Sequence, residues 1–529
     1  MCIRDRSSTV EVTGFDTWVL SLAVFLPLVG ALVIMLIPKA YETELKLVAL
    51  GSSLLALIVG AYIAIQFDYG AAGDLQFVVD KGWIDVINSR YIVGLDGLSL
   101  PLLLLSLVVV PLCLIYSWNH IPEPGNPKAF FVLLLILSTG MNGSFVAQDM
   151  ILFFVFFEVV LLPMYFLIGV WGGEDRRYAS LKFFLYTLFG SALMIISFLA
   201  LFFLSKDASG ELLHTFDMRI LTDVAGVGII KSTQVWIFAG LFMGFGIKVP
   251  MFPFHTWLPD AHTQAPTVGS VILAAVLLKL GTYGFVRIAI PFLPEGAIAW
   301  APWIGLLAVI GIIYGALGCL AQKDMKRLIA FSSVAHMGFV MLGIATLTDF
   351  GINAAIFGMI AHGLITGMLF FVAGSVKERY HTLEISRLGG LLKSAPRMGW
   401  ILGFASMASL GLPGLAGFWG EFPAILSAYN PGAVMPEETF RTYMVIAAIG
   451  TVLAAGYLLW LYQRTAFGEP PEEFAGHSIA DVNRDEWIAW MPFLIGIVLF
   501  GIWPNLIFNV TDDVVSGITA SVEAIAAGN

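Results

Sequence analysis

The sequence has 529 residues, of which 59% are hydrophobic and only 12% are charged. Its mean hydropathy of +0.89 exceeds that of soluble globular domains and therefore excludes a soluble protein. The net charge of -10 indicates no particular partner, because in a membrane protein the placement of lysine and arginine is more informative than their balance with the acids.

Residues 1–15 form a polar leader before the first apolar run. The leader lacks the order of positive charge, short apolar core and small-residue cleavage site that defines a signal peptide. Its first six residues, MCIRDR, look foreign to the rest of the chain, and we interpret them as a cloning or assembly artefact. We expect the leader to take no part in the fold.

Apolar runs of about 20 residues, the length that crosses a bilayer, predict about fourteen transmembrane helices. They lie near 16–37, 45–67, 96–118, 128–147, 149–171, 180–204, 234–254, 270–292, 300–321, 326–347, 351–376, 398–428, 442–465 and 487–510. The longest polar connections, 68–95, 205–233 and 466–486, are too short to form a soluble domain. The sequence thus predicts an all-α polytopic membrane protein with a single domain over 16–529.

The Lys and Arg residues divide unevenly between the two sides of these helices. Sixteen of the 27 lie on one side and nine on the other, while Lys248 and Lys279 remain inside apolar runs. The positive-inside rule assigns the richer side to the cytoplasm. An even number of helices then places both termini outside.

Two predicted helices, the seventh and the twelfth, are interrupted. Each carries a charge two residues before a proline, Lys248 before Pro250 and Glu421 before Pro423, and glycines and a further proline precede Glu421. A continuous helix normally avoids these residues. Because the two broken helices are five apart, the pattern predicts two inverted five-helix repeats, at about 128–292 and 300–465, with functional groups near the midplane.

Three charged residues lie at comparable depth inside the apolar runs: Glu158, Lys248 and Lys279. A buried charge is costly in hydrocarbon, at roughly 2.5–3.5 kcal/mol for lysine, and such residues usually have a function. We hypothesise that Glu158 pairs with Lys248, that opening the pair lowers the proton affinity of the lysine, and that a proton is thereby passed on. The alternative is that the pair only locks two helices together.

The other ionisable residues of the apolar runs have more than one interpretation. Glu421 and Lys279 have no evident single partner in the sequence. His336 and His362 either relay protons through their two ring nitrogens or are hydrogen-bonded packing residues.

A metal site is a further alternative. His255, Asp260 and His262 could ligate a metal, but they lack the regular spacing of a zinc site. The three cysteines are too scattered for a metal cluster or a disulfide framework. We expect neither a metal nor a redox cofactor in this chain.

Three stretches of the sequence resemble the antiporter-like membrane subunits of respiratory complex I. They are FFEVVLLPMYFLIGVWGG, GIKVPMFPFHTWLPDAHTQAPTVGSVILAAVLLKLGTYGFVR and LPGLAGFWGEF. The resemblance covers essentially everything after the leader. It implies fourteen helices, two inverted repeats and proton translocation driven by NADH oxidation and quinone reduction in other subunits, which carry the FMN and iron–sulfur clusters.

The resemblance also implies roles for individual residues. Glu158 matches the acidic partner of Lys248, Lys279 matches the central lysine, Glu421 ends a hydrophilic axis, and His255, His336 and His362 line or neighbour that axis. The expected neighbours include the sibling subunits L and N, which carry lysine where this chain has Glu421, and the expected location is the bacterial inner membrane. Two other functions stay open: a subunit of a cation/proton antiporter, and a scaffold whose charges only hold helices together.

Overall fold

A computed structural model describes residues 14–474 and 479–528 of the chain. The first six residues, for which the sequence suggests a foreign origin, lie outside the described residues, as does most of the leader 1–15.

The first six predicted spans are helices. They are α1 (Asp16–Leu36), α2 (Glu42–Gln66), α3 (Ser99–Tyr116), α4 (Pro127–Val146), α5 with α6 (Met150–Val159 and Leu161–Trp171) and α7 (Arg176–Leu204). The irregularity between α5 and α6 falls at Val160, because Pro163 has no N–H to donate to the carbonyl of Val159. At the start of α5, the Asp149 carboxylate accepts hydrogen bonds from the amides of Ile151 and Leu152.

The remaining spans are also helical. The seventh span is α9 (Lys231–Lys248). The eighth is a continuous helical run made of α11 (Thr267–Ile272), η4 (Leu273–Leu277), α12 (Leu278–Gly284), η5 (Phe285–Ala289) and α13 (Ile290–Phe292). The others are α14 (Pro294–Leu320), α15 (Met325–Ala345), α16 (Asp349–Tyr380), α18 (Pro396–Ser409) with α19 (Ala416–Ser427), α20 (Glu437–Ala466) and α21 (Arg484–Ile502). Shorter helices are α8 (Met218–Val224), η3 (Phe254–Thr256), α10 (Trp257–Gln264) and α17 (Leu391–Ser394).

Both helices that the sequence predicts to be interrupted are broken. Within the described ranges, twelve spans are long and apolar enough to cross a membrane, and the seventh and twelfth predicted spans are not among them. Helix α9 ends at Lys248, and α10 resumes at Trp257 after a proline-containing turn. The gap between α18 and α19 contains Gly411 and Gly414 with φ of +82° and +93°, a conformation that glycine adopts without strain. The inverted repeats at 128–292 and 300–465 stay a prediction.

Two features differ from the sequence prediction. The fourteenth helix was predicted to extend to residue 510, but α21 ends at Ile502, because Pro504 cannot donate to a preceding carbonyl, and a separate helix, α22 (Asn505–Gly528), follows. The connection 68–95 also contains an antiparallel hairpin of β1 (Gln76–Ile84) and β2 (Ser89–Leu95). The mostly helical class is confirmed, with this hairpin as a small addition.

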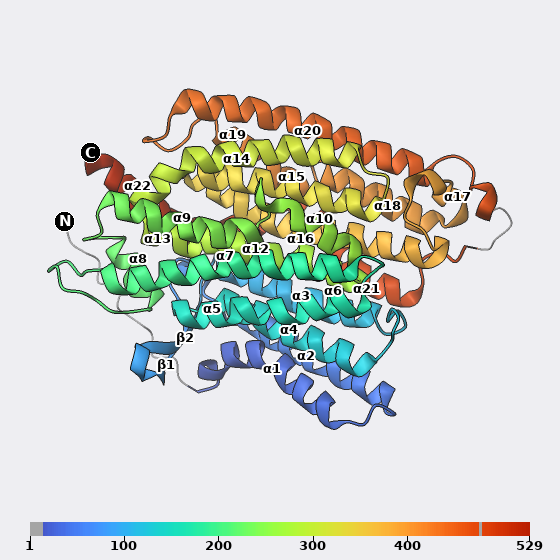
Figure 1. Ribbon diagram of the computed structural model, residues 1–529, viewed down its shortest axis with the longest axis horizontal. Helices are drawn as coiled ribbons and strands as arrows, with labels where there is room; N and C mark the ends of the chain where they lie inside the picture. Colours follow the sequence, from blue (N-terminus) through green and yellow to red (C-terminus); the bar gives the residue numbers. More distant parts are fainter. Residues whose placement is uncertain (1–13, 475–478, 529) are drawn as a thin grey trace.

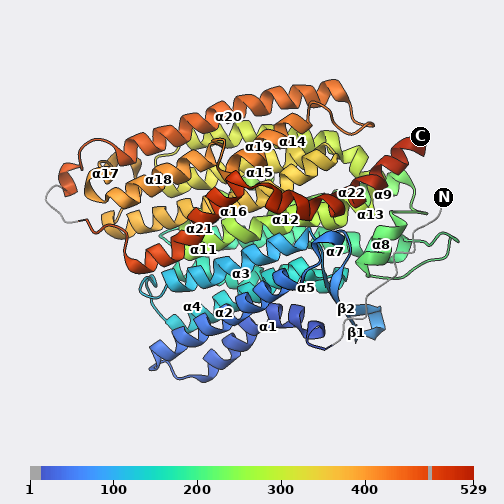
Figure 2. The same ribbon diagram turned by 180° about the vertical axis from the view of Figure 1, so that it is seen from behind.

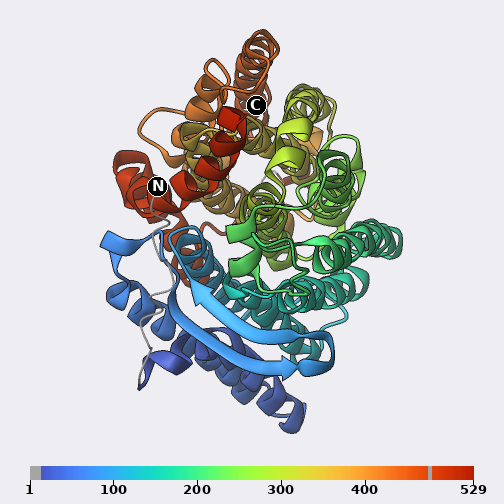
Figure 3. The ribbon, with the colours of Figure 1, turned by 90° about the vertical axis from the view of Figure 1, so that its left-hand side faces the viewer.

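The long helices run side by side along the longest axis of the molecule (Figures 1 and 2). The hairpin, α8 and α22 gather at one end, and α17 lies at the other (Figures 1 and 2). Seen from the hairpin end, β1 and β2 cross the ends of the helices (Figure 3). Helix α16 is buried along nearly all its length and contacts α15, α18, α19, α21 and α22, so its inward side chains lie at the centre of the bundle.

Candidate functional site

Six of the seven site residues predicted from the sequence are buried: Lys248, Lys279, Glu421, His255, His336 and His362. Glu158 is partly buried in the last turn of α5. Lys279 has no exposed surface at all. Their contacts decide what these ionisable groups can do, and their roles in proton transfer stay a prediction.

Glu158 and Lys248 do not form a direct ion pair. They are close enough to interact electrostatically. The Lys248 Nζ atom has no hydrogen-bonding partner among the residues that the structure describes, and it lies 4.5 Å from the centre of the Phe157 ring. A cation over an aromatic face is held by the negative face of the ring. The pair is thus open in this structure, and its proposed closing stays a prediction.

Lys279 lies in α12, between the two π-helical turns η4 and η5. Such turns widen a helix locally and occur frequently at functional sites. The Lys279 Nζ atom donates to the carbonyl of Ala274 at 2.5 Å and lies 2.7 Å from Nδ1 of His362 on α16. A single proton on this nitrogen–nitrogen contact can belong to either residue. The sequence showed no partner for Lys279, and the structure supplies His362.

Glu421 also has a partner that the sequence did not reveal. Its Oε1 atom lies 2.5 Å from Nδ1 of His336, which belongs to α15. The other ring nitrogen of His336 lies 3.1 Å from Oγ of Ser409 and 3.2 Å from the hydroxyl of Tyr457. Ser409 is the last residue of α18, so the helix break brings a hydroxyl to the histidine. Both ring nitrogens of His336 are therefore engaged, as a proton relay requires.

A small cavity separates the two contacts just described. The rings of His336 and His362 lie 6.0 Å apart, and both line the cavity together with Glu421. The cavity offers about 20 Å³ to the centre of a water molecule, which is enough room for one. Nε2 of His362 and Oε2 of Glu421 are buried and have no hydrogen-bonding partner in the described part of the chain. Their polar atoms make this a suitable place for a bridging water.

The three alternative metal ligands make other contacts. Asp260 forms ion pairs with Lys182 at 2.7 Å and with Arg327 at 3.4 Å. His255 packs against Tyr314, with ring centres 4.9 Å apart. His262 stacks on Phe370 at 4.6 Å.

A buried ion pair near the hairpin end escaped the sequence analysis. Arg287 donates to Asp96 at 2.5 Å, and it also contacts Tyr283 and Ser99. Arg287 lies eight residues after Lys279 and Tyr283 lies midway, which puts all three on one face of this helical run. The spacing of four residues between Lys279, Tyr283 and Arg287 was the signal that the sequence offered.

Two family models together match most of the chain between residues 22 and 440. One, described as NADH:quinone oxidoreductase/Mrp antiporter, transmembrane, matches residues 147–440, and one described as NADH-ubiquinone oxidoreductase chain 4, amino terminus, matches residues 22–141. The chain is 39% identical to NADH-quinone oxidoreductase subunit M of Rhodobacter capsulatus, over 92% of this chain and 94% of that protein.

Solved structures with the same fold include two membrane complexes. A chain of respiratory complex I from Thermus thermophilus with bound NADH matches with a TM-score of 0.82 and 28% identity, covering 95% of this chain and 99% of that one. A chain of the Mrp complex from a Dietzia species matches with a TM-score of 0.80 and covers 97% of this chain and 99% of that one. At 18% identity the second likeness shows the fold alone.

Proposed function

Because this chain belongs to the NADH-quinone oxidoreductase chain 4 and subunit M family, we propose that it carries protons across the membrane as part of that enzyme. It is a multi-pass membrane protein and a membrane-arm subunit of the complex. NADH oxidation and quinone reduction take place in other subunits and drive the proton transfer. The chain itself contributes electrostatics and proton-binding groups.

The observation that carries this proposal is the run of contacts between Lys279 and Glu421. It passes from Lys279 to His362 at 2.7 Å, across the small cavity to His336, and on to Glu421 at 2.5 Å. Every step joins two groups that can both accept and release a proton. A scaffold needs buried charges to be neutralised by partners, but it does not need a chain of histidines between a lysine and a glutamate.

The pair of Glu158 and Lys248 would control proton transfer along this run of contacts from Lys279 to Glu421, which we call the proton axis. Attraction between a carboxylate and an ammonium group is strong where few waters screen it, so closing or opening the pair changes the energy of holding a proton on Lys248. A disturbance from a neighbouring subunit that closes the pair would alter the field at Lys279, which lies in the next membrane-spanning run. Coupling of this kind acts in both directions between the two sites.

The proposal includes partners and orientation. The Lys and Arg distribution places both termini outside, and the antiporter-like subunits L and N are the proposed neighbours. NADH, FMN, iron–sulfur clusters and quinone would be bound by partner subunits. Within the described residues, Cys113 and Cys319 are buried in the separate helices α3 and α14.

The test replaces Lys279 by methionine in the assembled complex and measures NADH-driven proton uptake by inverted vesicles. We expect pumping through this subunit to fall at least about tenfold, because a positioned proton-transfer group contributes roughly 10²–10⁴-fold. Normal pumping in Lys279→Met would overturn the proposal. Transport that depends on a sodium gradient and not on NADH would favour the cation/proton antiporter instead.

A further inference from the structure

Aromatic side chains of two helices pack together next to Lys248. Phe153 and Phe157 belong to α5, Phe245 belongs to α9, and all three are buried. The ring centres of Phe153 and Phe157 lie 5.5 Å apart, and each lies 6.3 Å from the ring centre of Phe245. The packing of these three rings fixes the position of Phe157.

The sequence brings two different groups toward Lys248. Phe157 and Glu158 are consecutive residues of α5, so they differ by only about 1.5 Å in height along the helix axis. On α9, Phe245 and Lys248 are three residues apart and therefore lie on the same face of the helix. The Lys248 ammonium can thus bind an aromatic ring or a carboxylate at the same depth.

The structure shows the lysine on the ring. The Lys248 Nζ atom lies over Phe157 at 4.5 Å from the ring centre, well within the reach of about 6 Å for a cation–π contact. Only 2% of the lysine is exposed, and Nζ makes no hydrogen bond within residues 14–474 and 479–528. The ring face therefore supplies the direct contact that stabilises this buried charge.

The contact with the ring is weaker than a closed ion pair. An aromatic face attracts a cation through its quadrupole, whereas a carboxylate carries a full negative charge. The ring attraction also acts on the ammonium and not on the neutral amine, so it ends when Lys248 releases its proton. Phe157 can therefore hold Lys248 apart from Glu158 without preventing the pair from closing.

We propose that the Phe157 ring competes with Glu158 for the Lys248 ammonium and thereby sets the ratio of open to closed pairs. This inference rests on the proposed function, in which that pair controls the proton axis. Phe157 exchanges no proton, so it is a positioning residue. A disturbance from a neighbouring subunit closes the pair when it stabilises the lysine beside Glu158 by more than the ring stabilises it.

The test weakens the ring face with little change in its shape. Phe157 is replaced by phenylalanines that carry one, two or three ring fluorines, incorporated into the assembled complex by codon suppression. Each fluorine withdraws electrons from the face and weakens its attraction for a cation. The matched control is the same series at Phe153. That ring packs against Phe157 and Tyr283, and no lysine or arginine lies over it among the described residues.

Proton uptake driven by NADH is measured in inverted vesicles, per assembled complex. Losing the ring attraction changes the ratio of open to closed pairs by about 2- to 30-fold. We expect uptake to fall stepwise with each fluorine at Phe157, by at least about twofold with three, and to stay at the wild-type level throughout the Phe153 series. Equal uptake in all variants, or an equal fall in both series, would overturn the inference.

A structure of the assembled complex with three fluorines at Phe157 gives a second readout. We expect Lys248 Nζ to leave the ring and to lie within about 4 Å of the Glu158 carboxylate. A lysine that stays over the fluorinated ring would overturn the inference. Lost pumping in Lys279→Met together with unchanged uptake in the Phe157 series overturns this inference alone, whereas normal pumping in Lys279→Met overturns the proposed function.

Discussion

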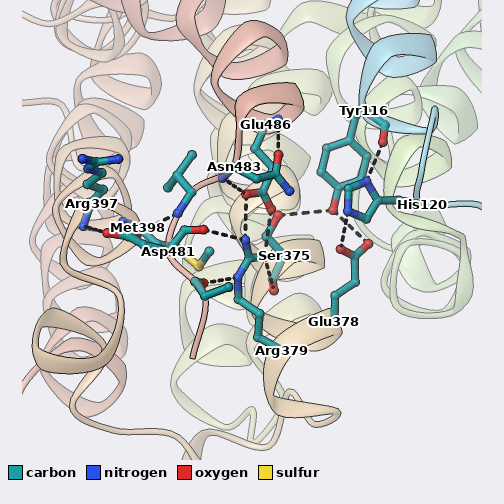
Figure 4. Close-up of polar contacts among 12 residues, drawn as sticks. Tyr116, His120, Ser375, Glu378, Arg379, Arg397, Met398, Asp481, Asn483 and Glu486 are labelled. Atoms are coloured by element: carbon teal, nitrogen blue, oxygen red, sulfur yellow. Dashed lines mark hydrogen bonds and ion pairs between the residues drawn. The ribbon is translucent and has the colours of Figure 1, made fainter. Parts of the chain in front are cut away.

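Replacing Arg379 by methionine is expected to impair assembly of the complex without changing the proton axis. All five N–H groups of Arg379 donate hydrogen bonds: two to Glu486 and one each to the carbonyls of Ser375, Ala480 and Asp481 (Figure 4). The Glu486 side chain has no exposed surface. The arginine thus fastens the end of α16 to the start of α21.

The size of the effect follows from this geometry. Removing one partner of a buried pair leaves an uncompensated charge and costs roughly 3–5 kcal/mol. That is a large part of a typical folding free energy of about 5–15 kcal/mol. It corresponds to a loss of roughly 140- to 4,000-fold in the ratio of folded to unfolded protein. The exposed pair of Lys393 and Glu469 is the matched control, and Lys393→Ala should cost only about 0–1 kcal/mol.

The assay is the amount of intact complex on native gels, together with the temperature of aggregation in detergent. The double variant Arg379→Met/Glu486→Gln should be more stable than Arg379→Met alone, because it also removes the unpaired charge. Complex that does assemble should pump normally. Wild-type stability of Arg379→Met, or a double variant that is the least stable of all, would refute this reasoning.

Three further predictions concern other parts of the chain. Glu421→Gln keeps a polar contact to His336 but cannot carry a proton, so we expect normal assembly and at least about tenfold less pumping, measured in vesicles. Asp149→Ala removes the N-cap of α5 and should cost about 1–2 kcal/mol, visible as a lower aggregation temperature. Burial raises the pKa of the Asp80 carboxyl, but Arg219 and Arg90 together lower it by more, so the pKa lies below its usual value. Ion pairs of the Asp80 carboxylate therefore stabilise the hairpin, and Asp80→Asn should speed hydrogen exchange of the β1 amides. In the wild type this stabilisation should be present above about pH 4 and be lost as the pH falls below that value and the carboxylate is protonated.

Apolar runs predicted most of the fold, because a bilayer forces each spanning segment to satisfy its own backbone hydrogen bonds. Proline and glycine predicted the two broken helices, because proline cannot donate a backbone hydrogen bond and glycine is unfavourable inside a helix. The hairpin was missed although a signal was present. Its strands are rich in β-branched and aromatic residues, and Asn88 at the turn has φ of +55°, a conformation that asparagine adopts more readily than most residues.

The candidate site was predicted only in part. Charged residues in apolar runs were found because they are costly there. Their partners were not found, because His362 is 83 residues from Lys279 and His336 is 85 residues from Glu421. Contacts between helices depend on how the bundle packs, and that packing has no signature in the spacing of one sequence. Tyr457, which lies in an apolar run of α20, gave no signal of any kind.

Proton uptake per NADH oxidised, in inverted vesicles with matched amounts of assembled complex, tests the central claim most directly. The wild type is compared with Lys248→Ala and Glu158→Gln. If the pair of Glu158 and Lys248 controls proton transfer between Lys279 and Glu421, both variants lose NADH-driven pumping, or the NADH oxidation coupled to it. Unchanged oxidation and unchanged pumping in both variants would contradict the account.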